Sequence, residues 1–396
     1  MRLMYFYFAA FALLYASPGQ AEWWRAQTGQ FVVYSESAPK STKQFAERLQ
    51  RFAEAMRIMQ KMPASTGRET QRLTIYRWGD ASDIAELHGS SRSVAGFYIP
   101  RATGSVAFVP ARSDSMSGGG GLGAETVLFH EYAHSFMLQH FPAAYPAWYV
   151  EGFAELYSTA SFLDNGVFRI GEPAYHRADQ LIYDDPFPAK KLFEPKPKPQ
   201  DGRHYYSVGW LLTHYLTFAP KRAGQLAKYL SAVNRGVSSE QAAREAFGNL
   251  DELSTEVRRY QGTRLIGIEY TPATYVPPPV ELRRLTAAEA AMMPVRLRSE
   301  RGVSKKTAAR VASDARGRAK PYPNDPFVQT ALAEAEFDAD NLDAAEAAAQ
   351  RALAADPAAA NAMNYLGLIE MKRAKKDPAR YAAARQWFLK ANRRDP

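Results

Sequence analysis

The chain contains no cysteine, and this absence excludes several kinds of chemistry at once. Disulfide bridges, thiol nucleophiles, zinc sites built on cysteine and a bacterial lipoprotein anchor are all ruled out. The 396 residues, of which 46% are hydrophobic and 23% charged, are enough to bury sizeable cores without such cross-links. A chain of this length is expected to form two or three domains.

Long hydrophobic runs are also scarce, and the most prominent one is at the N-terminus. Residues 3–15 are apolar, Arg2 precedes them, and Gly19 and Ala21 are small residues with the spacing of a cleavage site. This pattern indicates a secretory signal peptide, residues 1–21, and an uncleaved anchor is the alternative. We expect no stable membrane span after cleavage. The location would be periplasmic or secreted in a bacterium, since an exported chain without cysteine fits that environment best.

The sequence has no nucleic-acid-binding motif, although its formal net charge is +9. The glycine run at residues 118–121 is not followed by the Gly-Lys-Ser/Thr of a phosphate-binding loop, so we interpret it as a flexible linker. We therefore expect no nucleic-acid partner. The positive charge favours solubility and a weak attraction to anionic polymers of the cell envelope.

Hydrophobic patterning predicts an α+β protein. Residues 22–123 read as a small mixed α/β part, with strands at 29–37 and 72–78, a helix at 43–60, and a hairpin of 94–100 with 104–110. Pro110 favours an edge position for the second strand of that hairpin. Helical patterns dominate residues 124–263. The stretch 264–302, which contains TPATYVPPPVE, has the composition of a linker.

The C-terminal tail, residues 303–396, is rich in alanine and contains Asp-Pro pairs at 325–326, 356–357 and 395–396. Together with the segment Tyr365-Leu366-Gly367, these features resemble degenerate tetratricopeptide repeats. The resemblance implies stacked helix pairs and a surface that could bind a protein partner. A generic helical hairpin is the alternative.

The most specific motif is His130-Glu131-Tyr132-Ala133-His134, which has the form H-E-x-x-H. Residues four apart lie on one face of a helix, so His130 and His134 can reach the same metal ion. Glu131 lies about 100° around the helix axis, where it can reach a water molecule at that metal. The alternative is a pair of helix histidines without a metal.

A hydrolytic zinc site needs a third protein ligand, and the sequence offers two candidates. His140 has the spacing of the third ligand in the metzincin pattern. That pattern requires a glycine where this chain has Met137, and a methionine turn, whereas no methionine occurs between Met137 and Met292. The other candidate is Glu151, on a predicted second helix that a short turn would return toward the histidines. Glu155, four residues later, could orient His130.

The segments HEYAH and WYVEGFAELY together resemble the gluzincin metallopeptidases, and most of all the bacterial peptidase MA-like group of exported proteins. The resemblance covers most of residues 22–263. It implies Zn²⁺ held by His130, His134 and Glu151, with Glu155 as a supporting acid. Val150 departs from the family, which has asparagine there. What the resemblance implies is a reaction class, hydrolysis of peptide bonds, and no particular substrate.

The family also places a hydrogen-bond donor to the oxyanion on a later segment. The stretch RHYYSVGWLLTHYL, residues 203–216, is similar to that segment and aligns on Tyr206. Tyr205 and His204 are the alternatives, and a buried structural tyrosine is a further one. We interpret the remaining histidines as structural or surface residues, namely His88, His176 and His214.

These observations predict an exported zinc metallopeptidase that acts on a peptide or protein. Glu131 would serve as the general base, and strand 104–110 could hold an extended peptide by strand addition. One alternative is an envelope scaffold that binds partners through its repeats and has a structural or vestigial zinc site. Another is zinc-dependent hydrolysis of a non-peptide envelope substrate.

Overall fold

The structure, a computed structural model, describes residues 22–63, 72–89, 96–99, 104–112, 123–194 and 202–394. It has the mixed α+β architecture that the sequence predicts. The expected signal peptide and the glycine run lie outside the described residues. Within them, no helix combines the length and the apolar character that crossing a membrane requires.

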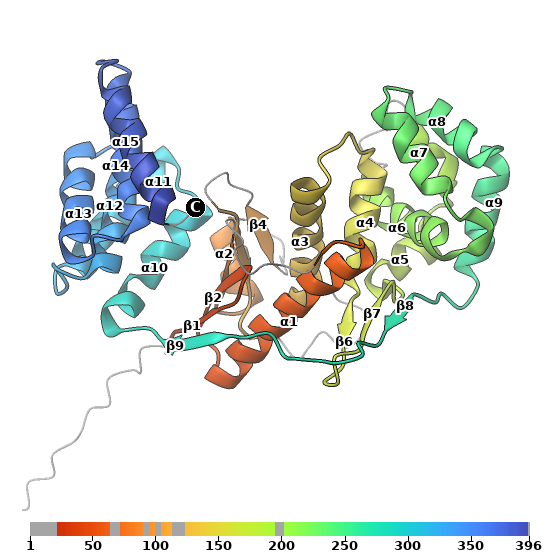
Figure 1. Ribbon diagram of the computed structural model, residues 1–396, viewed down its shortest axis with the longest axis horizontal. Helices are drawn as coiled ribbons and strands as arrows, with labels where there is room; N and C mark the ends of the chain where they lie inside the picture. The colour runs from red at the N-terminus through yellow and green to blue at the C-terminus, as the bar shows by residue number, and fades with distance from the viewer. Residues whose placement is uncertain are drawn as a thin grey trace, which may run out of the picture.

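The N-terminal part is built on a sheet whose described strands have the order β4-β5-β3-β2-β1-β9 (Figure 1). The three strands β2, β3 and β5 are parallel, and the other three pair antiparallel with their neighbours. The bounds are Trp24–Gln27 for β1, Phe31–Ser35 for β2, Leu73–Arg77 for β3, Phe97–Ile99 for β4, Val106–Val109 for β5 and Glu281–Arg284 for β9.

The expected hairpin is present as β4 and β5, but the expected edge position of its second strand is wrong. β5 lies between β4 and β3, and all four of its residues are buried, so the strand at this edge of the described sheet is β4, and β9 lies at the other edge. Pro110 follows the last paired residue, Val109, and its missing N–H therefore costs no ladder hydrogen bond. Residues 101–103 of the hairpin lie outside the described residues.

Helices cover both faces of this sheet. On one face, α1 (Pro39–Met59) and α3 (Ala124–His140) share a core with the strands that includes Phe31 and Phe52. On the other face, α2 (Ala81–His88) and α10 (Ala287–Arg301) pack around Tyr76 and Phe108. The helix that carries H-E-x-x-H therefore lies on the α1 side of the sheet.

A second, helical core follows α3. Helix α4 (Ala147–Ser158) packs against both α3 and α6 (Gly202–Phe218), and so joins this core to the sheet. A small antiparallel sheet of β6 (Ser161–Phe162), β7 (Phe168–Ile170) and β8 (Ile268–Tyr270) lies beside it. The remaining elements of this part are η1 Tyr175–Arg177, α5 Ala178–Ile182, η2 Ala189–Phe193, η4 Pro220–Arg222, α7 Gln225–Asn234, α8 Ser239–Phe247 and α9 Leu250–Gln261.

The stretch 264–302 is not the plain linker that its prolines suggested, because it contains β8, β9 and α10. β9 extends the sheet antiparallel to β1, and a capping box between Thr286 and Glu289 begins α10. The helical tail consequently starts at Ala287, ahead of the expected boundary at residue 303. Each helix packs on the next in the series α11 Lys305–Ala319, α12 Pro326–Asp338, α13 Leu342–Ala355, α14 Ala360–Ala374 and α15 Arg380–Arg394.

A buried ion cluster joins this tail to the sheet. Arg296 on α10 lies 2.6 Å from Glu300 and 3.6 Å from Glu334 on α12, and it donates a 3.1 Å hydrogen bond to the hydroxyl of Tyr76 on β3. Burial, followed by the charge of Glu300, raises the pKa of Glu334 to about 8, although Arg296 opposes the shift. Glu334 therefore holds its proton in the folded protein at pH values where an unfolded chain would release it.

This pKa shift predicts that stability declines with rising pH. The folded state binds one more proton than the unfolded state between the ordinary pKa of 4.5 and about 8, so the free energy of unfolding falls across that window. The thermal midpoint of Glu334→Gln should fall less between pH 5 and pH 9 than that of the wild type, by at least about 2 °C. Glu240→Gln, which changes an exposed carboxylate, is the control. Identical pH profiles for wild type and Glu334→Gln would contradict the assignment.

Candidate metal centre

Helix α3 is buried on several sides because it lies between the sheet layer and α4. Phe129 and Phe136 face the core shared with α1 and the sheet, while His130 and His134 face α4. Its first turn carries Glu125, which suits the positive end of the helix dipole. The motif thus places two imidazoles inside the protein, where their polar atoms need partners.

Two glycines allow α4 and α6 to cross closely. A side-chain carbon added at Gly152 would lie 2.5 Å from the carbonyl oxygen of Gly209, and one added at Gly209 would lie 2.7 Å from the carbonyl oxygen of Trp148. Such distances are shorter than any normal contact, so only glycine fits at either position. Glu151, which precedes Gly152, is thereby fixed opposite the histidines.

The structure brings His130, His134 and Glu151 together. The Oε2 atom of Glu151 lies 3.3 Å from Nε2 of His130 and 3.4 Å from Nε2 of His134, and the two Nε2 atoms are 3.0 Å apart. One ligand atom from each residue lies within 4.8 Å of the others. Two imidazoles and one carboxylate are a normal ligand set for hydrolytic zinc.

The hydrogen bonding around these atoms also fits a cation. Nδ1 of His130 lies 3.3 Å from Glu155, which favours the proton on Nδ1 and leaves the lone pair of Nε2 directed toward Glu151 and His134. Glu151 Oε2 is buried and makes no hydrogen bond within the described residues. Electron-pair donors that face one another at such distances need a positive charge between them, which a metal ion or a proton supplies.

The same balance of charge appears in the pKa values. Burial would lower the pKa of His130, but the carboxylates of Glu151 and Glu155 outweigh it and raise the value to about 9. Burial would raise the pKa of Glu151, yet the two imidazoles lower it to about 2. Both shifts mean that the cluster favours a full negative charge on Glu151 and a positive charge beside it.

Glu155 is the centre of a second set of contacts. Its carboxylate is almost completely buried and, besides His130, contacts Nε2 of His176 at 2.7 Å and Nε of Arg177 at 3.1 Å. Burial raises the pKa of Glu155, but these three partners together hold it well below its ordinary value. The carboxylate is therefore charged, as a group that orients a ligand histidine should be.

His176 and Arg177 were not predicted as site residues. They belong to η1, a short element after β7, and H-E-x-x-H spacing gives no information about them. His176 is better described as part of the candidate site than as the unrelated structural or surface histidine expected from the sequence. The available signal in the sequence was the pair of adjacent basic residues, His176 and Arg177, in an otherwise irregular segment, and this signal is weak.

Glu131 and Tyr206 lie at the border of the cluster. Burial raises the pKa of Glu131, and the neighbouring His130 and His134 partly oppose the shift. The ring of Tyr206, on α6, is stacked on His130 with centroids 5.9 Å apart, and the guanidinium carbon of Arg177 lies 4.9 Å from its centroid. Burial and the charge of Glu151 raise the pKa of Tyr206 to about 12, so its hydroxyl keeps its proton.

The other sequence candidates lie elsewhere. His140, at the end of α3, packs its ring on Phe136 with centroids 4.6 Å apart, and it is not part of the ligand cluster found in the described residues. His204 stacks on Phe187, and Tyr205 packs against the second core. Tyr206, the first candidate on α6, stacks its ring on that of His130.

His214 and His88 behave as expected from the sequence. His214 is fully buried, and its two nitrogens contact the hydroxyl of Tyr260 and the carbonyl of Gly171, both at 2.9 Å. His88 ends α2 and packs on Phe97.

No protein-family model and no curated protein matches the chain. A function for the chain is therefore inferred from the geometry of the cluster.

The ligand set predicts which variants lose metal. Glu151→Ala and His134→Ala should lose most of the bound zinc, because each removes one of three ligands. Glu155→Ala should weaken zinc binding by about 10- to 100-fold, since it removes only the support of His130. His140→Ala is the matched control and should bind zinc as the wild type does. Titration with a fluorescent zinc chelator measures all four; loss of zinc in His140→Ala with retention in Glu151→Ala would reverse the assignment.

The helix crossing predicts a separate effect on stability. Gly152→Ala should destabilise the protein by about 1–3 kcal/mol, because the added carbon has no space between α4 and α6. Gly317→Ala is the control: it also places alanine in a helix interior, but nothing lies within 4 Å of the added carbon. Urea denaturation compares the two variants. Equal midpoints for both would show that the crossing tolerates a side chain.

Proposed function

We propose that this protein is a zinc-dependent hydrolase of peptide bonds. The observation that carries the proposal is the convergence of His130, His134 and Glu151 on one point, beside a carboxylate, Glu131, that is not needed as a ligand. A purely structural site has no use for that additional carboxylate. The resemblance of the two helix motifs to gluzincin metallopeptidases supports the same reaction class.

Each residue of the cluster has a part in this reaction. Zinc held by the three ligands would polarise the scissile carbonyl and lower the pKa of a water molecule. Glu131 accepts the proton of the attacking water and delivers it to the leaving amine, a task for which a raised pKa is suitable. Glu155 keeps the His130 ring oriented through its contact with Nδ1.

Tyr206 is the candidate donor to the oxyanion. Its hydroxyl remains protonated at neutral pH, as a donor must. Arg177 contacts both Glu155 and the face of the Tyr206 ring. One guanidinium therefore holds Glu155, which orients His130, and also Tyr206, which faces the reacting carbonyl. Arg177 is in this account a positioning residue.

The edge strand β4 supports a peptide as the substrate. It is next to α3, and the hydroxyl of Tyr98 on β4 contacts the hydroxyl of Ser135, which follows the ligand His134. An extended peptide that pairs with β4 would consequently run alongside the zinc ligands. In this proposal the peptide therefore pairs with the edge strand β4, and not with the interior strand β5.

The role of Glu131 distinguishes an enzyme from a scaffold. Glu131→Gln preserves size and hydrogen bonding but accepts no proton, so it should bind zinc normally and cleave an unfolded, fluorescein-labelled casein at least about 100-fold more slowly. Glu125→Gln, on the exposed part of the same helix, should cleave at the wild-type rate. Equal cleavage by wild type and Glu131→Gln would reject the proposed mechanism, and absence of cleavage by zinc-loaded wild type would favour the scaffold.

A further inference from the structure

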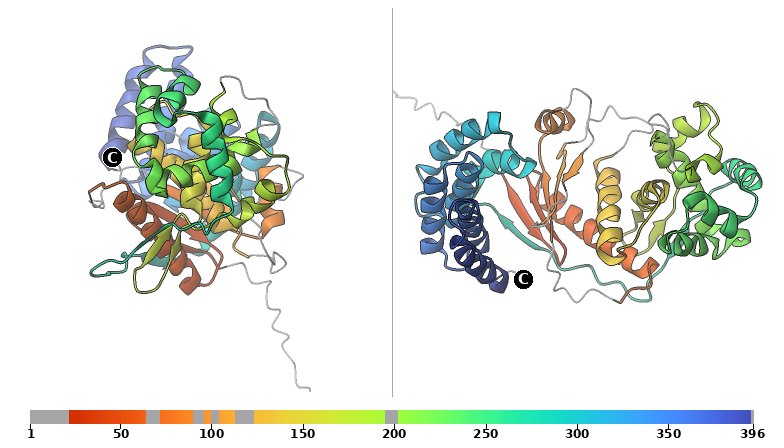
Figure 2. Two further views of the ribbon diagram at one scale, coloured as in Figure 1. Left: turned by 90° about the vertical axis from the view of Figure 1, so that its right-hand side faces the viewer. Right: turned by 90° about the horizontal axis from the view of Figure 1, so that it is seen from above.

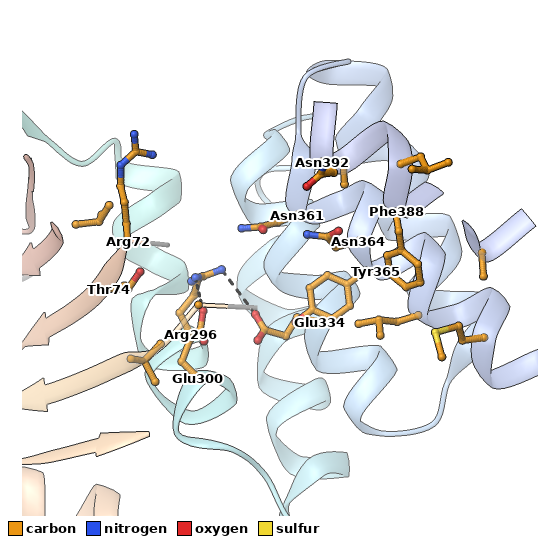
Figure 3. Close-up of a pocket in the computed structure, with 18 of the residues that line it drawn as sticks. Arg72, Thr74, Arg296, Glu300, Glu334, Asn361, Asn364, Tyr365, Phe388 and Asn392 are labelled. Atoms are coloured by element: carbon orange, nitrogen blue, oxygen red, sulfur yellow. Dashed lines mark hydrogen bonds and ion pairs between the residues drawn. The ribbon is translucent and has the colours of Figure 1, made fainter. Parts of the chain in front are cut away.

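Two cavities in the described residues differ in their lining. The larger, about 1020 Å³, lies between the sheet and the C-terminal helices, and charged and amide side chains stand on both of its sides (Figure 3). The other, about 760 Å³, borders the second, helical core and is formed by α5, α6, β7, β8 and the segments next to them. Figure 2 shows the C-terminal helices and this helical core at opposite ends of the molecule. The smaller cavity is therefore a separate site, and its volume lies within the range of about 300–1,000 Å³ that small-molecule pockets have.

Apolar side chains form the inner walls of the smaller cavity. Ile170 on β7, Ala174 before η1, and Trp210 and Leu211 on α6 all line it, and each is at most 3% exposed. None of these four side chains carries a charge. A ligand that enters the cavity consequently contacts hydrocarbon, and its own apolar surface leaves water.

Two polar side chains of the lining already have partners in the protein. The amide of Gln261 donates a 3.0 Å hydrogen bond to the carbonyl oxygen of Leu181, and the hydroxyl of Thr263 donates one of 2.8 Å to the carbonyl oxygen of Tyr260. These donors are therefore used within the protein. A peptide would have to bury backbone groups that need such partners, whereas a hydrocarbon chain needs none.

The charged side chains of the lining leave one cation available. Arg169 lies 2.7 Å from Glu269, its neighbour in the β7–β8 ladder, and the hydrogen bond with Glu269, followed by the charge of Glu172, raises the pKa of Arg169. Both carboxylates of the lining thus act on the same guanidinium. Arg264 is exposed and, in the described part of the chain, makes no hydrogen bond or ion pair. The lining consequently matches a ligand that has an apolar body and one negative group.

Large apolar side chains stand exposed at the rim of the cavity. Tyr175 on η1, Ile182 on α5 and Ile266 before β8 line it and are 74%, 61% and 63% exposed. Single exposed apolar residues are common, but three around one opening form a contiguous patch of the kind that marks a binding site. The rim thus extends the apolar surface of the inner walls outward.

One wall of the cavity is also next to the support of the candidate metal centre. Tyr175 and Ala178 line the cavity, and between them in the chain are His176 and Arg177, which contact Glu155. None of the three candidate metal ligands is part of the lining. The cavity therefore lies behind the segment that holds Glu155, and it is distinct from the place where a scissile bond would meet the metal.

We propose that this cavity binds one long-chain fatty acid, whose hydrocarbon tail lies among the apolar inner walls and whose carboxylate pairs with Arg264. The side chains of Tyr175, Ile182 and Ile266 cover the tail where it enters. A single free molecule fits better than a bilayer surface, because attraction to an anionic bilayer needs several basic residues together, and Arg264 is the one unpaired cation that the described lining supplies.

Fluorescence titration of the full mature chain with cis-parinaric acid, a fluorescent long-chain fatty acid, tests the proposal. The probe is kept below the concentration at which it forms micelles. The acid should bind saturably, and at least about tenfold more tightly than its uncharged methyl ester, because the ester cannot pair with Arg264 as a carboxylate does.

Two variants separate the contact with the carboxylate from the contact with the tail. Arg264→Glu should weaken binding of the acid about tenfold and leave binding of the ester within about twofold of wild type, because the ester has no charge to repel. Ile266→Asn should weaken binding of both probes about fivefold, since it removes apolar contact that both share. Both positions are exposed, so neither change removes a buried contact of the fold.

Two controls make the result specific. Arg259→Glu makes the same change of charge at an exposed position of α9 outside the lining, and Glu131→Gln alters only the metal centre; both should bind the acid within about twofold of wild type. The second control keeps this test independent of the proposed hydrolysis. The proposal is overturned if acid and ester bind alike or if Arg259→Glu weakens binding as much as Arg264→Glu. It is likewise overturned if the chain sediments with phosphatidylglycerol vesicles in a way that requires Arg264 and Ile266 while the monomeric acid does not bind.

Discussion

The candidate site is governed by a shortage of positive charge in a buried space. Three glutamates, Glu131, Glu151 and Glu155, lie near the imidazoles of His130 and His134; Glu155 is buried, and the other two are partly buried. Burial disfavours each negative charge, yet Glu151 and Glu155 are held in the charged form by their neighbours. A divalent cation held by His130, His134 and Glu151 would resolve this conflict more completely than a single proton, because it would accept an electron pair from each of them.

The rest of the structure serves to hold these groups in place. The sheet and α1 support α3 from one side, and the close crossing of α4 and α6 at Gly152 and Gly209 sets the position of α4 on the other. The same crossing brings Tyr206, on α6, against the His130 ring. Arg177 then joins the two helices by contacting Glu155 and Tyr206 together. The proposed ligand, supporting acid and oxyanion donor are thus parts of one packing arrangement.

The sequence could predict the residues of the cluster because they lie on two consecutive helices with a short turn, where spacing of four translates directly into a shared face. It could not predict Arg177, whose place depends on where the chain goes after β7. It also placed the wrong strand of the hairpin at the edge of the sheet. Pro110 lies just past the end of β5, and in the sequence such a proline looks the same as a proline within an edge strand. Helix α10 was missed because the proline-rich segment TPATYVPPPVE shortly before it made the whole stretch look like a linker. Thr286 and Glu289 have the spacing of a capping box, and this signal for the start of a helix was present in the sequence.

The most direct test of this account is the anomalous diffraction of a crystal of the mature protein grown with zinc, measured on both sides of the zinc absorption edge. The account predicts one strong peak that appears only above the edge, at about 2.0–2.2 Å from Nε2 of His130, Nε2 of His134 and a carboxylate oxygen of Glu151. A peak bound by His140 in place of Glu151, or the absence of any peak at the two histidines, would contradict it.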